Sequence, residues 1–417
     1  MFKPVLTIFY QFNPWHSSIG GIQTLIKTFI KYAPETFEIR LVGTGGEQQA
    51  TGQWHEAEFS GRSMQFFPLI SLGDDNSRRL IPTTVKYTAA LFGKSLASDF
   101  MHFHRLEPTV VSRQWSGDKT LFVHNDIYQQ MQASSDQGSI LWQRFAPLYF
   151  KLERSLMGQF NQILSCNSES VRLYQQRYPA VADRVAYYKN AFDTELFYPL
   201  EPAIRQQQRQ RLAQRLQLDP ETQFLLFAGR LHPQKDPLLL VRSLAALADP
   251  KVHLLIAGDG ELNDAVQMEI QQLQLAKQVT LLGPLPQEQL VELLQVAGAC
   301  VLTSAYEGLP IVVLEALACG TPIVTTPCGE TPHLLDKQSG VVCTGREPTI
   351  IAEAWRRVLY APDQFPSSAC VRVVHPYSAQ IVVEQIYEAM TERWHQQEKA
   401  NRPIYSVGAT VARKSSA

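Results

Sequence analysis

The chain has 417 residues, a hydrophobic fraction of 45% and a formal charge of −1 at pH 7. This length exceeds what one core usually supports, so we expect two domains. The near-neutral charge provides no basic field to favour nucleic acid, and the sequence has no apolar run of about 18 residues that would predict a membrane-spanning helix. The six cysteines are scattered without a CxxC pair, which indicates reduced thiols and argues against a disulfide frame or zinc site.

The first half of the chain shows apolar strands alternating with helices. The opening letters MFKPVLTIFY lead straight into a strand and show no secretory leader, so we expect a cytoplasmic protein. A loop over 43–46 and short strands and turns over 47–70 interrupt the alternation. The strands are predicted at 5–10, 37–42, 100–104, 120–123, 162–166 and 185–188, and the helices at 22–32, 79–98, 139–160 and 171–178.

Several residues of this half stand where strands end. Gly20 and Gly21 separate the first strand from its helix, where a phosphate could approach backbone N–H groups, although a tight turn explains them equally well. His124 follows the strand 120–123, at the edge where open α/β sheets bind ligands. Its position is equally compatible with a functional role and with that of a loop histidine that only forms structural hydrogen bonds. His102 and His104 share one strand face, but no third metal ligand stands at a recognisable spacing.

The second half follows a prolyl hinge at 189–202 and repeats one pattern. Each apolar strand is followed by a glycine or polar loop and then by a helix, which predicts a doubly wound parallel sheet. Helices follow at 351–360 and 377–397, and the last 18 or so residues lack an apolar pattern. The strands are predicted at 224–228, 253–257, 279–282, 299–303, 323–326 and 340–343.

The stretch 303–326, TSAYEGLPIVVLEALACGTPIVTT, reads as strand, loop, helix, turn and strand. Pro310 is predicted at the first helical position, where its missing N–H costs nothing. Glu307 precedes the helix, and Glu315 lies about five residues inside it, or roughly 7.5 Å along the axis. A helix N-terminus suits a phosphate, and a carboxylate on either side suits hydroxyl groups on either side. A nucleotide sugar has this order of groups.

Two cations are predicted at the same edge of the sheet. Arg230 and Lys235 follow the strand 224–228 and would form charge-assisted hydrogen bonds with a diphosphate. Gly258 follows the next strand, so its backbone is expected at this edge as well. Arg230 and Lys235 could instead be surface cations, as lysine and arginine usually are. Their place after a glycine in a strand-to-helix loop favours the diphosphate.

Over nearly its whole length the chain resembles the retaining glycosyltransferases of family 4, which have the GT-B fold. This resemblance implies an α/β protein with two Rossmann-like doubly wound domains facing across a cleft: an acceptor-binding domain at 1–195, a nucleotide-sugar donor domain at 196–375, and a helix at 376–398 that crosses back. The residues 399–417, which lack an apolar pattern, are expected to form a disordered tail. The motifs that carry it are Gly20-Gly21, His124, KNAFDTELFYP, FAGRL with Lys235, IAGDGEL, YEGLPIVVLEALACGTPIV and the helix after His375-Pro376-Tyr377.

The resemblance also implies roles for the residues. Arg230 and Lys235 would bind the donor diphosphate, Glu315 the ribose and Glu307 the donor sugar, while His124 would lie near the reacting sugar. Backbone N–H groups near Gly21, Gly308 and Leu309 would complete the phosphate cradle. The predicted catalytic residues are His124, Arg230, Lys235 and Glu307, and the predicted substrate-binding residues are Gly20, Gly21, Arg230, Lys235, Gly258, Glu307, Gly308, Leu309 and Glu315.

The expected reaction is retaining transfer of a hexosyl group in cell-surface polysaccharide, glycolipid or glycoside synthesis. The expected donor is UDP- or GDP-linked, the acceptor is a saccharide or a lipid-linked saccharide, and no metal, cofactor or nucleic acid is expected. A lipid-linked acceptor would add peripheral contact with the inner membrane face to the cytoplasmic location. The alternatives are a GT-B nucleotide-sugar epimerase and a non-catalytic nucleotide-sugar-binding homologue.

One segment departs from the family pattern. The family commonly has Gly-Gly-x-Pro-Glu after the strand that follows the glutamate helix, whereas this chain has Cys328-Gly329-Glu330-Thr331-Pro332-His333. Glu330 stands where a glycine is usual, and His333 where a glutamate is usual. We therefore assign neither residue a donor contact.

Overall fold

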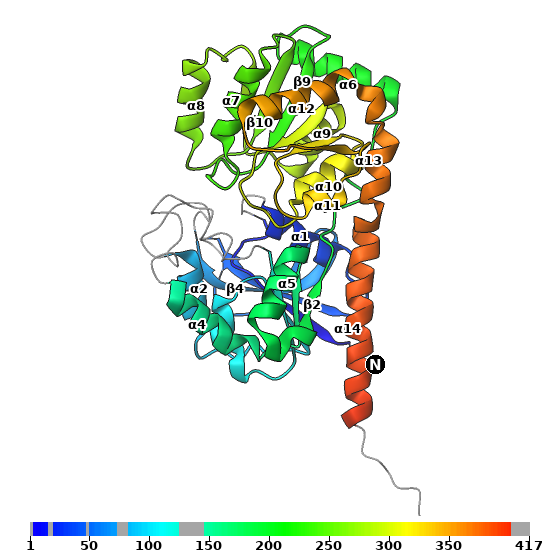
Figure 1. Cartoon of the computed structure of the whole chain (residues 1–417). Helices are drawn as coiled ribbons and strands as arrows, with labels where there is room; N and C mark the ends of the chain where they lie inside the picture. The colour runs from blue at the N-terminus through cyan, green and yellow to red at the C-terminus, as the bar shows by residue number, and fades with distance from the viewer. Residues whose placement is uncertain (1–2, 16–19, 47–49, 73–81, 125–145, 402–417) are drawn as a thin grey trace, which may run out of the picture.

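A computed structural model describes residues 3–15, 20–46, 50–72, 82–124 and 146–401. It contains two parallel-stranded sheets, one from each half of the chain, stacked one above the other (Figure 1). Most of the predicted tail at 399–417, and parts of the predicted helices at 79–98 and 139–160, lie outside the described residues. Within the described ranges, no helix combines the length and apolarity needed to cross a bilayer.

The N-terminal sheet has eight strands in the order β3-β4-β2-β1-β5-β6-β7-β8. Every neighbouring pair is parallel except β3 and β4. The order reverses between β1 and β5, which makes their carboxyl ends the place where such sheets bind ligands. The strands are β1 Val5–Phe9, β2 Glu38–Gly45, β3 His55–Phe59, β4 Arg62–Ser71, β5 Phe100–Phe103, β6 Asp118–Val123, β7 Gln162–Ser165 and β8 Val185–Tyr187.

The helices of this half cover the sheet with one apolar face each. In α1, Leu25, Ile26, Phe29 and Ile30 are buried at the 3.6-residue period that predicts an amphipathic helix. The helix α5 begins after Asn167, whose side chain caps it. The helices are α1 Gly21–Lys31, α2 Thr83–Leu91, α4 Ala146–Met157 and α5 Ser168–Arg177.

The C-terminal sheet has six parallel strands in the order β11-β10-β9-β12-β13-β14. This is the strand order of a dinucleotide-binding doubly wound fold, and its reversal lies between β9 and β12. The strands are β9 Gln223–Ala228, β10 Val252–Ala257, β11 Val279–Gly283, β12 Ala299–Leu302, β13 Ile323–Thr325 and β14 Gly340–Val342. The helices are α6 Pro202–Arg215, α7 Pro237–Leu247, α8 Asn263–Gln272, α9 Gln287–Val296, α10 Ile311–Ala318, α11 Thr331–Leu334, α12 Pro348–Tyr360 and α13 Ser367–Val374.

The last helix, α14 (Ala379–Asn401), lies against the N-terminal half (Figure 1). The Tyr387 hydroxyl donates to the Phe29 carbonyl oxygen at 3.3 Å, and Arg393 Nε donates to Asp118 Oδ2 at 2.7 Å. Asp118 is almost fully buried, so this arginine neutralises a carboxylate at the start of β6.

Three local predictions were wrong. The predicted loop at 43–46 is mostly strand, because β4 pairs with β2 through Gly45. The helix predicted at 79–98 ends at Leu91, and Gly93 follows in a left-handed conformation with φ +75°. Pro310 is not the first helical residue but the residue before it, with extended backbone angles.

Candidate active site

The loops that follow β9 and β12 lie side by side at the point where the C-terminal strand order reverses. Ala305 N–H donates to the Gln234 carbonyl oxygen at 2.8 Å. The buried Thr303 hydroxyl lies 2.9 Å from the carbonyl oxygens of both Lys235 and Asp236. Arg346 donates to Asp236 Oδ2 at 2.6 Å and to the Ser304 carbonyl oxygen at 2.5 Å. These bonds fix the backbone from which the predicted site residues project.

Lys235 and Glu307 form an ion pair between these two loops. Lys235 Nζ lies 2.5 Å from Glu307 Oε1, and only 17% and 8% of the two side chains are exposed. Gln234 Nε2 lies 3.4 Å from Glu307 Oε2 and donates to the Tyr306 carbonyl oxygen at 3.1 Å. The structure therefore brings together a cation and a carboxylate that the sequence predicts at one sheet edge.

Arg230 is exposed two residues after β9, and within the described ranges its guanidinium forms no hydrogen bond or ion pair. Its loop is built on a close backbone contact: a Cβ at Gly258 would collide with the Gly229 carbonyl oxygen, and Gly258 has φ +142°. Gly258 thus has a structural reason to be glycine. Its predicted contact with the donor stays a prediction.

Glu315 lies on α10 and is 4% exposed. Gln287 Nε2 donates to Glu315 Oε1 at 3.3 Å, and Lys27 Nζ, from α1, donates to Gln287 Oε1 at 3.0 Å. Burial raises the pKa of Glu315 to about 7, while the Gln287 hydrogen bond and the Lys27 charge act in the opposite direction. The side chain predicted to bind ribose is thus linked through one amide to a lysine of the N-terminal half.

The N-terminal half also holds the loop that carries Glu307. Asn167 Nδ2 donates to the Glu307 carbonyl oxygen at 3.3 Å, and the buried Asn190 donates through Nδ2 to the Leu309 carbonyl oxygen at 2.7 Å. A Cβ at Gly308 would collide with the His124 carbonyl oxygen, so only glycine permits this approach of the two halves. The predicted residues Gly308, Leu309 and His124 therefore lie together where the two halves of the chain meet.

His124 Nε2 is 3.0 Å from His104 Nδ1, and the two rings stack with centroids 5.2 Å apart. Burial, followed by the charge of Arg105, lowers the pKa of His124 to about 3, and burial lowers the pKa of His102 to about 3 as well. His124 is consequently a neutral hydrogen-bonding group at physiological pH. Over the ranges that the structure describes, no group of three His, Cys, Asp or Glu side chains could hold a metal ion.

Gly20 and Gly21 lie at the start of α1. Gly20 precedes the helix with extended angles, and Gly21, the first helical residue, has open space where a Cβ would be. The first turn of α1 carries no acidic side chain. Its N–H groups follow β1, one of the two strands at which the N-terminal order reverses.

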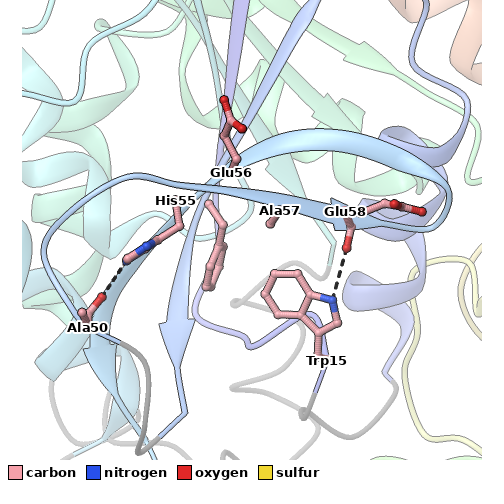
Figure 2. Close-up of a pocket in the computed structure, with 7 residues that line it drawn as sticks. Trp15, Ala50, His55, Glu56, Ala57 and Glu58 are labelled. Carbon is pink, nitrogen blue, oxygen red and sulfur yellow. Dashed lines mark hydrogen bonds between the residues drawn. The ribbon is translucent and has the colours of Figure 1, made fainter.

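A separate hollow of about 510 Å³ lies beside β3 (Figure 2). Trp15, on the segment between β1 and α1, is 40% exposed and donates through Nε1 to the Glu58 carbonyl oxygen at 3.3 Å. Its ring meets Phe66 edge-on with centroids 5.1 Å apart, and His55 Nε2 lies 3.0 Å from the Ala50 carbonyl oxygen. The sequence did not single out this hollow, because its residues come from segments more than 30 positions apart.

Residues 208–367 match the family model of glycosyl transferases group 1. This part of the chain is therefore similar to the glycosyl transferases of group 1. Among the similar curated proteins are D-inositol 3-phosphate glycosyltransferases of Frankia alni, 36% identical over 44% of this chain and 47% of that protein, and of Thermomonospora curvata, 30% identical over 54% of each. The chain thus spans about half the length of the curated relatives it matches, and the matched residues 208–367 include Arg230, Lys235, Glu307 and Glu315.

Solved structures extend the similarity to both halves. A sucrose-phosphate synthase from Thermosynechococcus elongatus matches 96% of this chain and all of its own with a TM-score of 0.77 at 17% identity. Anabaena HepE, in complex with UDP and glucose, matches 93% of this chain and all of its own with a TM-score of 0.68 at 17% identity. At these identities the similarity concerns the fold, and it confirms the predicted GT-B architecture.

The sequence missed most of the groups that support the site. Gln234 precedes Lys235, and Asn190 lies in KNAFDTELFYP, so both stand inside motifs that were already singled out. Their polar side chains could have indicated that they support the site. Arg346, Asn167 and Gln287 lie in segments without any recognised motif. Their roles emerge only from the tertiary contacts.

Proposed function

We propose that the chain transfers a hexosyl group, with retention of configuration, from a nucleoside-diphosphate sugar to an acceptor hydroxyl. The observation that carries this proposal is the Lys235–Glu307 pair at the strand reversal, directly before the N-terminus of α10. Its place within the residues 208–367, which match the glycosyl transferases of group 1, supports it. Lys235 and Arg230 would bind the diphosphate, Glu307 the hydroxyls of the hexose and Glu315 those of the ribose.

In the proposed reaction the bond between the anomeric carbon and the leaving phosphate oxygen breaks, and the acceptor oxygen bonds to that carbon on the same face. The leaving phosphate takes the acceptor proton. Negative charge grows on the phosphate, so Lys235, Arg230 and the N–H groups of α10 act more strongly in the transition state than on the bound donor. In this proposal these groups supply the positive charge that a bound metal ion supplies in metal-dependent transferases. The neutral His124 would donate a hydrogen bond to the transferred sugar.

The acceptor side of the proposal places a saccharide or other polyol on the N-terminal half. The hollow beside β3 offers an exposed indole and an imidazole, groups that pack against sugar rings and bond to their hydroxyls. The relatives named for D-inositol 3-phosphate and the neighbour holding glucose both handle polyols. Trp15→Ala should raise the acceptor KM about tenfold, as expected for losing one aromatic contact. An unchanged acceptor KM would remove the hollow from the acceptor site.

A lipid-linked acceptor would bring the cytoplasmic protein to the inner membrane face. The helix α4 carries Leu148, which is 59% exposed, and the exposed Lys151 and Arg154 follow on the same helix. An apolar side chain among cations suits an anionic lipid surface. Cosedimentation with vesicles containing phosphatidylglycerol, compared between wild type and Leu148→Asp, tests this contact.

A panel of UDP- and GDP-linked sugars tests the central proposal. A donor present at 100 times its Kd should stabilise the protein by about 2.7 kcal/mol and raise its melting temperature. The stabilising donor is then incubated with saccharide acceptors, and a retaining transferase releases nucleoside diphosphate and forms a glycoside of unchanged anomeric configuration. An isomerised nucleotide sugar would instead identify an epimerase. Binding without turnover across the acceptor panel would identify a non-catalytic homologue.

A further inference from the structure

The segment that departs from the family pattern makes a contact between the two halves. Glu330 is 8% exposed, and its Oε2 accepts hydrogen bonds from Ser168 N–H at 2.8 Å and from Ser168 Oγ at 2.9 Å. Ser168 is the first residue of α5, in the N-terminal half, whereas Glu330 precedes α11, in the C-terminal half. A carboxylate of one half therefore accepts from the start of a helix in the other.

The start of α5 explains why this contact is favourable. The first N–H groups of a helix have no partner within it. Asn167 Oδ1 accepts from Glu169 N–H at 2.8 Å and from Ser170 N–H at 3.0 Å, which leaves the Ser168 N–H for another acceptor. Glu330 supplies that acceptor and places a negative charge at the positive end of the helix dipole. A glycine at position 330 would have no side chain with which to do this.

The same segment packs on the loop that carries Glu307. Glu330 N–H donates to the Gly308 carbonyl oxygen at 2.9 Å. Gly329 has φ +65°, and a Cβ there would come within 2.8 Å of the Glu307 carbonyl oxygen and 3.0 Å of the Glu307 Cβ. Asn167, next to Ser168, donates to the same Glu307 carbonyl oxygen. The start of α5 thus holds the Glu307 loop directly through Asn167 and indirectly through Ser168 and Glu330.

We propose that Ser168 and Glu330 form an interdomain clasp that positions Glu307. Neither residue touches the proposed donor; they hold the loop 307–309 against the N-terminal half, so that the Glu307 carboxylate keeps its place beside Lys235. The clasp itself is a structural claim, whereas its effect on turnover rests on the proposed function. A GT-B chain with glycine at this position lacks the carboxylate, so the clasp is a feature of this chain's own sequence.

Hydrogen exchange in the full-length protein tests the clasp without any substrate. Glu330→Gly should make the Ser168 amide exchange roughly tenfold faster, the size expected for losing a hydrogen bond to a charged group. Peptides covering 303–312 should lose protection as well. Ser168→Ala keeps the backbone donor and should give a smaller change, and Glu330→Gln, whose amide oxygen can still accept, should retain most of the protection. Glu384→Gln on the exposed face of α14 is the matched control.

Turnover tests the positioning role separately. With a donor and acceptor that the wild type uses, Glu330→Gly should lower kcat about tenfold or more at a nearly unchanged donor KM, because a misplaced group costs rate more than ground-state binding. Glu330→Gln should restore most of kcat. Unchanged exchange in Glu330→Gly overturns the clasp, and faster exchange with unchanged kcat overturns the positioning role. A wild type inactive with every donor overturns the proposed function, and the exchange result still decides the clasp.

Discussion

Glu307 and Glu315 lie on either side of the start of α10, yet their carboxylates have different environments: one is paired with a cation, and the other is buried beside a neutral amide. Glu307 meets a lysine at 2.5 Å in a loop, so its negative charge is neutralised by a positive one. Glu315 lies inside the helix, is almost fully buried, and has one neutral amide as its described hydrogen-bond partner. Glu307 is thus held in a charged pair, whereas burial raises the pKa of Glu315 to about 7, close to neutral pH.

This comparison indicates how one helix start can serve two parts of a ligand. A group that must stabilise developing charge benefits from a fixed, charged environment. A carboxyl group that only accepts hydrogen bonds from hydroxyls can be protonated while the site is empty, provided that ligand binding favours its ionised form.

The largest effect is expected from breaking the ion pair. Lys235→Ala and Glu307→Gln should each lower kcat/KM for the matched donor and acceptor by roughly 100- to 1,000-fold, because the transition state loses a preorganised charge. Steady-state kinetics measure the loss, and far-UV circular dichroism confirms the fold. Glu269→Gln breaks a comparable ion pair with Arg242 on the outer surface and should leave kcat/KM unchanged. Wild-type rates in both site variants would refute the assignment.

Glu315 should make stability depend on pH. Its folded pKa of about 7 lies above the usual 4.5, so its stabilising contribution is present below about pH 4.5 and is lost as the pH rises to about 7. The shift corresponds to a free-energy change on the order of 3 kcal/mol. Urea unfolding at pH 4.5 and pH 8 should show a smaller loss of stability for Glu315→Gln than for the wild type. Equal losses in both proteins would contradict the raised pKa.

Donor affinity should rise with pH through the same titration. If the ribose hydroxyls bind the ionised carboxylate, Kd for the nucleotide sugar should fall roughly tenfold between pH 6 and pH 8, as a group with a pKa of about 7 ionises. Calorimetry at the two pH values measures this change. Glu315→Gln should bind with the same affinity at both. A similar rise in affinity in the variant would assign the pH dependence to another group.

The smallest effect is expected from the lysine of α1. Because the Lys27 charge lowers the pKa of Glu315, Lys27→Met should raise it, by less than about one unit, and move the midpoint of donor binding to higher pH. Calorimetric titration over closely spaced pH values measures the midpoint. Lys86→Met, which removes a partly exposed lysine of α2, is the control. A midpoint moved to lower pH would contradict the electrostatic link from Lys27 to Glu315.

The sequence was sufficient wherever the signal was local. The alternation of strands and helices predicted the doubly wound sheet of the second half, and the resemblance to a known family implied the same for the first. The motif around Glu307 and Glu315 predicted a helix start between two carboxylates. Where pairing between distant segments decides, the sequence failed. Gly43 and Gly45 suggested a loop because glycine is rare in strands, but the pairing of β2 with β4 made them strand. The proximity of Glu307 to Lys235 was predicted only as a shared sheet edge.

The sequence alone determined the alternating strands and helices and which residues follow the strands of the second sheet, because strand periodicity and turn chemistry act over a few neighbouring residues. Chain length and the family resemblance supplied the expectation of two domains. Only the tertiary structure decided what those residues meet. The ion pair of Lys235 with Glu307 and the burial of Glu315 follow from the packing of loops and helices that are 28 to 72 positions apart. The clasp between Ser168 and Glu330 spans 162 positions, and no local pattern encodes a contact between groups brought together only by folding.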